Sequence, residues 1–307
     1  MPLPKPSLLD HVGSMVSCAK LAIAASRSPA SGLTRERTWT RQRAGIASLQ
    51  AAAVQHRWKN KHEALFHAAG EGDKEKILQL LAAKANIHCR PSDWQSDTDG
   101  FFSNRDFTDQ VTPLHNAALR GCSESVDILL RHGAEIESRS ESGRTPLHCA
   151  SDGGGWVQPS RDEMLRDMFG TSHENHGKVV RMLLDCGAKV DVRDCSGDTP
   201  IHNAATYGNW EVLQLLVSHG ADVNAKSPAP WIRFLSLPSG MMEKYGTTPM
   251  HLAAAGGHCD AVSMLLDFGA DAGARNIANR TPWEEAEKRQ HIKVMEVLRA
   301  RGWNPDS

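Results

Sequence analysis

The chain has 307 residues, of which 40% are hydrophobic, and its formal net charge is −1. This length suits one or two ordinary domains or a single repeat array, and the hydrophobic fraction is sufficient for a substantial core. No apolar run approaches the roughly 18 residues that a membrane-spanning helix needs, so we expect no membrane span.

The small net charge hides two oppositely charged parts. Residues 1–62 hold 10 Lys and Arg against 2 Asp and Glu, a net charge of +8, and residues 63–307 carry a net charge of −9. The acidic part argues against a nucleic-acid-binding surface, because phosphate recognition needs clustered Lys and Arg. A nucleic-acid role would therefore depend on the basic N-terminal part alone.

The N-terminal part divides into two segments. Residues 1–43 are rich in Arg and Ser and poor in acids, which predicts a disordered basic arm and is also compatible with a mitochondrial presequence. Residues 44–62 predict a helix that packs on the open end of the array that follows. The apolar residues that recur there at helical spacing are Ile46, Leu49, Ala53 and Val54.

A four-residue motif recurs along the rest of the chain. It reads Thr-Pro-Leu-His at 112–115 and 145–148, Thr-Pro-Ile-His at 199–202, Thr-Pro-Met-His at 248–251 and Thr-Pro-Trp-Glu at 281–284. The first two copies are 33 residues apart, and so are the last two, whereas the middle gaps are longer. A fixed period with interruptions indicates about six repeats over residues 63–303, followed by a short tail at 304–307.

Each repeat reads as two antiparallel helices and a turn, most regularly at 111–143. Thr112 and Pro113 suit a helix start. Gly121 and Gly133 suit the ends of the two helices, because Gly reaches the left-handed conformation without a steric penalty. In the first and last repeats polar residues replace some apolar ones, as expected at array ends.

Three insertions interrupt the array. They lie at about 91–107, 153–172 and 227–243. The second splits the repeat that opens at Thr145, so the second helix of that repeat is expected to resume near His176. The third is unusually apolar for a loop, and an exposed apolar patch generally marks an interaction site.

The sequence holds no recognisable catalytic motif. A nucleophile elbow, a phosphate loop, a metalloprotease helix and a dinucleotide fingerprint are all absent. The seven cysteines form no C-x-x-C pair, which favours reduced thiols and no metal site. We therefore expect no enzyme activity, no metal and no cofactor.

The motif, its period, the alanine pairs after it and the later Leu-Leu and Gly-Ala pairs resemble the ankyrin repeat over roughly residues 63–302. The resemblance implies an all-α solenoid of stacked helix–turn–helix units with projecting loops. It also implies protein–protein binding rather than catalysis. The opening histidines would then be structural, bonded within and between repeats: His115, His148, His202 and His251.

The resemblance further implies contacts with a partner at loop positions before the opening Thr and at the end of each first helix. The matching residues, with two from the third insertion, are Leu119, Arg120, Glu141, Arg144, Asp198, Thr206, Tyr207, Lys244, Tyr245, Trp231 and Phe234. Tyr207 and Tyr245 are expected to form an aromatic anchor. Each position could instead be an ordinary solvated surface residue.

The favoured interpretation is an intracellular adaptor or scaffold, cytoplasmic or nuclear. It would bind a protein partner through the concave ankyrin face and the apolar insertion loops, and would take no small-molecule substrate. The alternative is a mitochondrially targeted regulatory or assembly factor that uses the basic arm as a presequence.

Overall fold

The computed structural model describes residues 60–90, 109–153, 173–227 and 246–303. Contacts divide the chain into residues 1–58 and 59–307, and every described residue lies in the second unit. The expected basic arm, most of the expected helix over 44–62 and the C-terminal tail lie outside the described residues. So does the greater part of each insertion.

The described residues form six helix pairs and contain no strand, which confirms the expected all-α repeat architecture. The pairs are α3 (Lys61–Glu71) with α4 (Lys74–Ala82), α5 (Pro113–Leu119) with α6 (Ser123–Arg131), α7 (Pro146–Ser151) with α9 (His173–Asp185), α10 (Pro200–Thr206) with α11 (Trp210–Ser218), α13 (Pro249–Gly256) with α14 (Cys259–Asp267), and α15 (Pro282–Lys288) with α16 (Ile292–Ala300).

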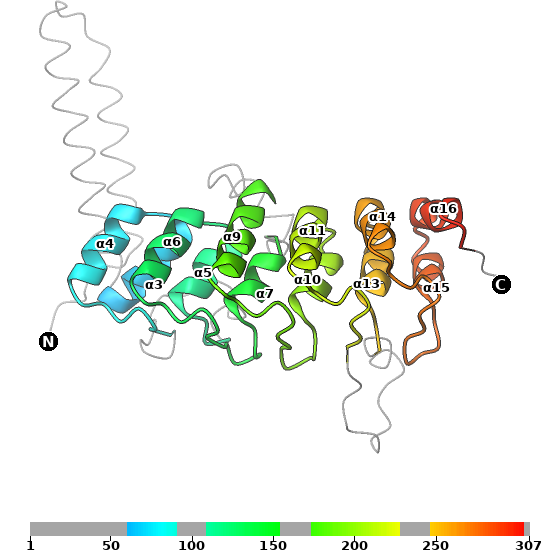
Figure 1. The fold of residues 1–307 in the computed structure, drawn as a ribbon. Helices are drawn as coiled ribbons and strands as arrows, with labels where there is room; N and C mark the ends of the chain where they lie inside the picture. The colour runs from blue at the N-terminus through cyan, green and yellow to red at the C-terminus, as the bar shows by residue number, and fades with distance from the viewer. Residues whose placement is uncertain (1–59, 91–108, 154–172, 228–245, 304–307) are drawn as a thin grey trace, which may run out of the picture. The chain divides into compact units, whose positions relative to one another are not determined.

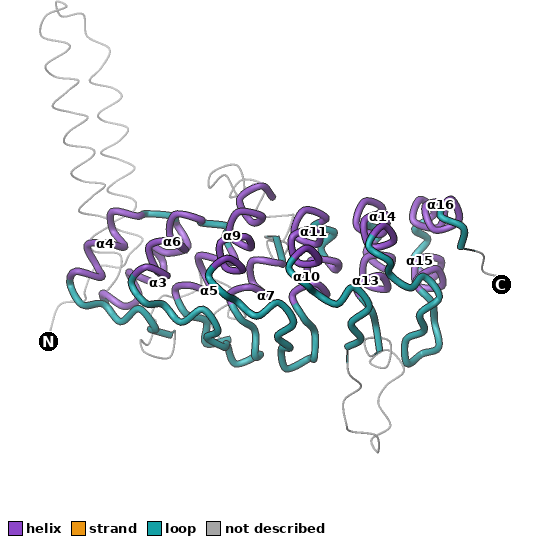
Figure 2. The backbone as a smooth tube through the Cα atoms, viewed as in Figure 1, coloured by secondary structure: helices purple, strands orange, loops and turns teal. Residues whose placement is uncertain are grey.

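The pairs stack so that first helices contact first helices and second helices contact second helices. Each first helix packs against the first helix of the next pair, and each second helix against the next second helix. Figure 1 shows the resulting two layers, with α5, α7, α10 and α13 in one and α6, α9, α11 and α14 in the other. The described parts of the loops that join one pair to the next extend from the same side of the layers (Figure 2).

Local sequence explains where the first helices begin and end. Five of them start with an extended Thr followed by Pro, which lacks the N–H that has no partner in a first turn. Gly121 and Gly208 follow two of these helices with φ of 70° and 69°. A Cβ atom at Gly208 would also lie 2.5 Å from the ring of His258, so Gly is required there for two reasons.

The core lies between the layers. Small first-helix residues such as Ala117 and Ala118 are fully buried and let neighbouring helices approach closely. Opposite them, each second helix from the second repeat onward completely buries a leucine at the same repeat position: Leu129, Leu183, Leu216, Leu265 and Leu298. Burial of one such side chain contributes about 1.5–3 kcal/mol, so this row is a principal source of stability.

Two expected boundaries differ from the structure. The second helix of the split repeat begins at His173 rather than near His176, and it has 13 residues, whereas α6 has 9. In the other repeats a short turn fixes the start of the second helix, and the insertion removes that limit. The array itself begins at Lys61 rather than Glu63, because Asn60 caps α3 by accepting the N–H of His62 at 3.0 Å.

The last repeat ends the stack with its own contacts. Trp283 of α15 is 5% exposed, and its ring stacks on Trp303 with centroids 5.2 Å apart. The Arg299 guanidinium lies over Trp283, 5.3 Å from the ring centroid. Arg299 replaces the second leucine of the earlier repeats, and it covers an aromatic face that would otherwise meet solvent.

Candidate partner-binding surface

The opening histidines join consecutive repeats. In the third repeat, the Nδ1 atom of His148 accepts the N–H of Thr145 at 3.1 Å, so the proton of a neutral ring lies on Nε2. That Nε2 atom then donates to the carbonyl oxygen of Asp198 in the fourth repeat, at 3.2 Å. One imidazole thus caps its own helix and holds the following loop.

The same forward bond recurs at the other three histidines. His115 donates to the carbonyl of Arg144 at 3.0 Å, His202 to that of Thr247 at 3.3 Å, and His251 to that of Arg280 at 2.9 Å. The four bonds connect the second to the sixth repeat in an unbroken series.

Burial keeps these rings neutral. Loss of hydration lowers the pKa of His115 and of His148 to about 4, and it also lowers the pKa values of His202 and His251. Both nitrogen atoms of each ring are already bonded inside the protein. None of the four is therefore placed to exchange a proton with a substrate.

A second series of bonds runs backward between the repeats, and sequence reasoning missed it. The Nε2 atoms of His176, His258 and His291, at the starts of second helices, reach carbonyl oxygens at the ends of preceding first helices. The accepting residues, at 3.0, 2.9 and 3.0 Å, are Leu119, Thr206 and Ala255. Each of these histidines lies seven residues before a fully buried leucine, and that spacing was the available signal.

The fourth repeat departs from this backward pattern. Asn209 stands at the corresponding position and accepts the N–H of Val212 at 3.3 Å. Its Nδ2 atom is buried without a hydrogen-bond partner among the described residues. The fourth repeat therefore lacks the backward histidine bond that the third, fifth and sixth repeats each make to the repeat before them.

Four of the predicted contact residues lie at the ends of first helices. Leu119 is half-buried and Arg120 exposed after α5, whereas Thr206 is exposed and Tyr207 half-buried at the end of α10. The carbonyl oxygens of Leu119 and Thr206 accept the backward bonds. The backbone at these positions is thus held in place, while Arg120 remains exposed to solvent.

Arg144 is more enclosed than its loop position suggested. Its side chain is 14% exposed and forms an ion pair with Asp152, whose side chain is 1% exposed. The guanidinium also donates to the carbonyl of His148 at 3.4 Å. Most of the Arg144 side chain is therefore buried and bonded within the protein. A role for Arg144 in binding a partner stays a prediction.

Tyr207 lies beside this ion pair. Burial raises the pKa of Tyr207 to about 12, and the Asp152 carboxylate adds to the effect. The phenol therefore stays protonated and presents a hydroxyl group and a partly accessible ring. This combination is typical of residues that anchor protein interfaces.

The remaining predicted contacts are divided between described and undescribed parts of the chain. Glu141 is exposed in its loop, and Asp198 is half-buried and accepts a bond from the Ser227 hydroxyl. Lys244, Tyr245, Trp231 and Phe234 lie outside the described residues, so the expected pairing of Tyr207 with Tyr245 stays a prediction.

The described part of the chain shows neither a metal cluster nor a membrane-spanning helix. Within it, no group of three or more His, Cys, Asp or Glu side chains could hold a metal ion. No helix there is long and apolar enough to cross a bilayer. The cysteines of these residues are free thiols, and Cys149 is fully enclosed.

Two-helix units, bonded forward and backward by histidine side chains and joined by projecting loops, define a solenoid repeat protein. A family model for ankyrin repeats in three copies matches residues 65–158 and 170–227, and a model for the single ankyrin repeat matches 142–195 and 245–277. The chain belongs to the ankyrin-repeat family, as the motif predicted. Ankyrin repeats generally mediate protein–protein interaction.

Several known proteins are similar to part of this chain. Over 112 residues, the chain is 34% identical to ankyrin repeat and SOCS box protein 16 of Mus musculus, covering 36% of this chain and 22% of that protein. Over 132 residues it is 33% identical to a transient receptor potential cation channel subfamily A member 1 homolog of Caenorhabditis elegans, covering 39% and 11%. The chain thus spans less than a quarter of the length of these relatives.

A solved structure supports the same fold. The crystal structure of the human ASB11 ankyrin repeat domain aligns with a TM-score of 0.57 at 22% sequence identity. The alignment covers 79% of this chain and 85% of that domain. At this identity the likeness concerns the fold alone.

Proposed function

We propose that this protein is a non-catalytic adaptor or scaffold that binds a protein partner through its projecting loops and its first-helix face. This face is the surface of the layer formed by α3, α5, α7, α10, α13 and α15. One observation carries the proposal. The backbone at the ends of α5 and α10 is fixed by bonds between repeats, while the side chains of Arg120, Thr206 and Tyr207 take no part in those bonds. Such a preformed surface binds without a large ordering cost.

The chemistry of the histidines supports a binding role over catalysis. Enzymes that use histidine need a nitrogen atom that can reach the substrate. In His115, His148, His202 and His251 both ring nitrogens are bonded within the stack, so the groups that would first suggest a general base are structural.

The apolar third insertion belongs to the same proposal. Trp231 and Phe234 would add apolar contact area next to the loop that precedes the fifth repeat. Large aromatic side chains often contribute a large share of the binding free energy of a protein interface.

A double substitution tests the proposal. In the full chain, Tyr207→Ala with Tyr245→Ala is expected to weaken binding to an identified partner by about 30-fold or more, as for an interface hot spot. The thermal midpoint should change little. Ile292→Ala, at an exposed residue on the other layer, is the control and should leave binding unchanged. Equal affinity of the double variant and the wild type would refute a role for the first-helix face.

The composition of residues 1–43 favours a second candidate, a regulatory or assembly factor directed to mitochondria. The N-terminus of the protein isolated from cells decides between them. A shortened N-terminus supports mitochondrial import. An intact Met1 or Pro2 supports the adaptor, which we place in the cytoplasm or nucleus.

A further inference from the structure

The second-helix layer exposes large apolar side chains in the last three repeats. Trp210 is 43% exposed, Phe268 38% and Ile292 66%. Trp210 is the first residue of α11, where α4 has Lys74 and α6 has Ser123. The same position holds Cys259 in α14 and Ile292 in α16. Packing within the stack does not explain an aromatic ring at the start of α11, since much of its surface meets solvent.

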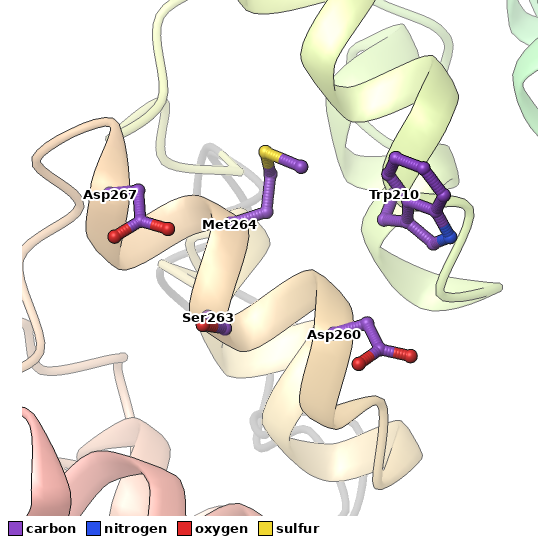
Figure 3. A pocket seen from close by; sticks show the side chains of 5 residues that line it. All are labelled: Trp210, Asp260, Ser263, Met264 and Asp267. Carbon is purple, nitrogen blue, oxygen red and sulfur yellow. The ribbon is translucent and has the colours of Figure 1, made fainter.

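Trp210 borders a shallow hollow between two neighbouring repeats. The hollow has a volume of about 370 Å³ and is lined by Trp210 from α11 and by Asp260, Ser263, Met264 and Asp267 from α14. Figure 3 shows the indole ring on one side and the side chains of α14 spread along the other. The two helices pack against each other, so the lining belongs to one continuous surface.

The two carboxylates of the hollow have different surroundings. Asp267 pairs with Arg301, and the same guanidinium donates to the Ser263 hydroxyl at 2.9 Å. Asp260 makes no ion pair with any cation of the described residues. The lining therefore combines an accessible aromatic ring with one uncompensated negative charge.

We propose that this hollow binds an arginine or lysine side chain from a basic segment of a protein partner. A cation is attracted to the face of an indole ring, and more strongly when a carboxylate lies close by. Met264 offers an adaptable apolar contact for the aliphatic stem of the same side chain. Charge complementarity selects this occupant, because an apolar anchor would leave the Asp260 carboxylate in a less hydrated setting without a partner.

This surface is distinct from the first-helix face. Its residues lie on α11 and α14 in the opposite layer. The two surfaces can be tested separately, and the loss of one leaves the other in place.

A titration of the full chain labelled with 5-fluorotryptophan tests the proposal. The probe is the peptide acetyl-Gly-Arg-Gly-amide, and its matched control carries citrulline, which is neutral and nearly the same shape. The fluorine signal of Trp210 is identified by its loss in Trp210→Phe. We expect the arginine peptide to move this signal along a saturating curve and the citrulline peptide to leave it in place.

Two variants locate the charge. Asp260→Asn should weaken binding of the arginine peptide by about threefold or more, which is the scale of an exposed ion pair combined with a cation–π contact. Glu135→Gln removes an exposed carboxylate from a distant loop and should leave the affinity unchanged. Equal shifts with both peptides, wild-type affinity of Asp260→Asn, or no shift of the Trp210 signal would each overturn the proposal.

Discussion

The Nε2 atom of His148 lies 3.2 Å from the carbonyl oxygen of Asp198, although 50 residues separate them along the chain. The second insertion lies between these two residues. The forward bond thus connects the third and fourth repeats as it does the others, and the insertion leaves this element of the stack intact.

Removing the His148 ring should destabilise the array. His148→Ala leaves the buried Thr145 N–H and the Asp198 carbonyl without their partner and opens a cavity, at a cost of about 2–4 kcal/mol. Urea unfolding measures the difference. His132→Ala is the matched control, because His132 is exposed and bonds only within its own helix, to Ile128 at 2.8 Å. A similar loss in both variants would contradict the structural role of His148.

Mild acid should also weaken the fold. The pKa of His115 and His148 is about 4 in the folded state and 6.5 in the unfolded chain, so the unfolded chain binds more protons between these values. The stability from neutral rings is complete above pH 6.5 and declines as pH falls towards 4, by about 1.4 kcal/mol per pH unit for each histidine. His202 and His251 act in the same direction.

Urea midpoints at a series of pH values from neutral to mildly acidic measure this effect. Asp194 opposes it, because burial raises its pKa and favours the protonated folded state, but it is one group against four. A midpoint that stays constant across the range would show that the histidines do not govern the response.

The ion pair of Arg144 and Asp152 should respond unequally to single and double substitution. Arg144→Met leaves a buried carboxylate without its partner, at a cost of about 3–5 kcal/mol. Arg144→Met with Asp152→Leu removes both charges, and Leu119 occupies the position of Asp152 in the preceding repeat. The double variant should recover most of the loss in urea unfolding. Additive costs would mean that the two side chains do not act as a pair.

The stacked tryptophans should hold the last repeat in place. Trp303→Ala removes the ring that covers Trp283 and should cost about 1–3 kcal/mol. Amide hydrogen exchange should quicken in α16 more than in α6. Trp210→Ala, which removes a more exposed ring, is the comparison and should leave exchange in α16 unchanged.

The thiols should differ sharply in reactivity. Cys186 and Cys195 are exposed, whereas Cys149 is buried and burial raises its pKa to about 12. Iodoacetamide reacts with the thiolate, so peptide mapping at neutral pH should find Cys186 and Cys195 labelled well before Cys149. Equal labelling of all three in the folded protein would contradict the enclosure of Cys149.

The repeats were predictable because their signals are local. Thr145 and Pro146 define a helix start within two residues, and the recurrence of this pair reveals the period. The pairing of Arg144 with Asp152 was not predictable, since it joins a loop to a helix end through a fold that sequence spacing does not describe. The exposure of Trp210 was missed for a similar reason. Periodicity predicts which face of a helix a residue lies on. The exposed fraction of its side chain depends on contacts with the neighbouring repeat, which periodicity does not describe.

Glu284 shows that the stack has a direction. Its carboxylate accepts the N–H of Thr281 at 2.6 Å, as the imidazoles do in the earlier repeats, but it has no N–H to offer the loop of a further repeat. A copy of an inner repeat inserted before α15 would be contacted by the histidine of the repeat before it, and its own histidine could donate to the loop of the repeat after it. The same copy placed after α16 would have neither bond. A repeat copy inserted in the interior of the stack should therefore gain a forward histidine bond, whereas a copy placed after α16 should gain one only if Glu284 is first changed to histidine.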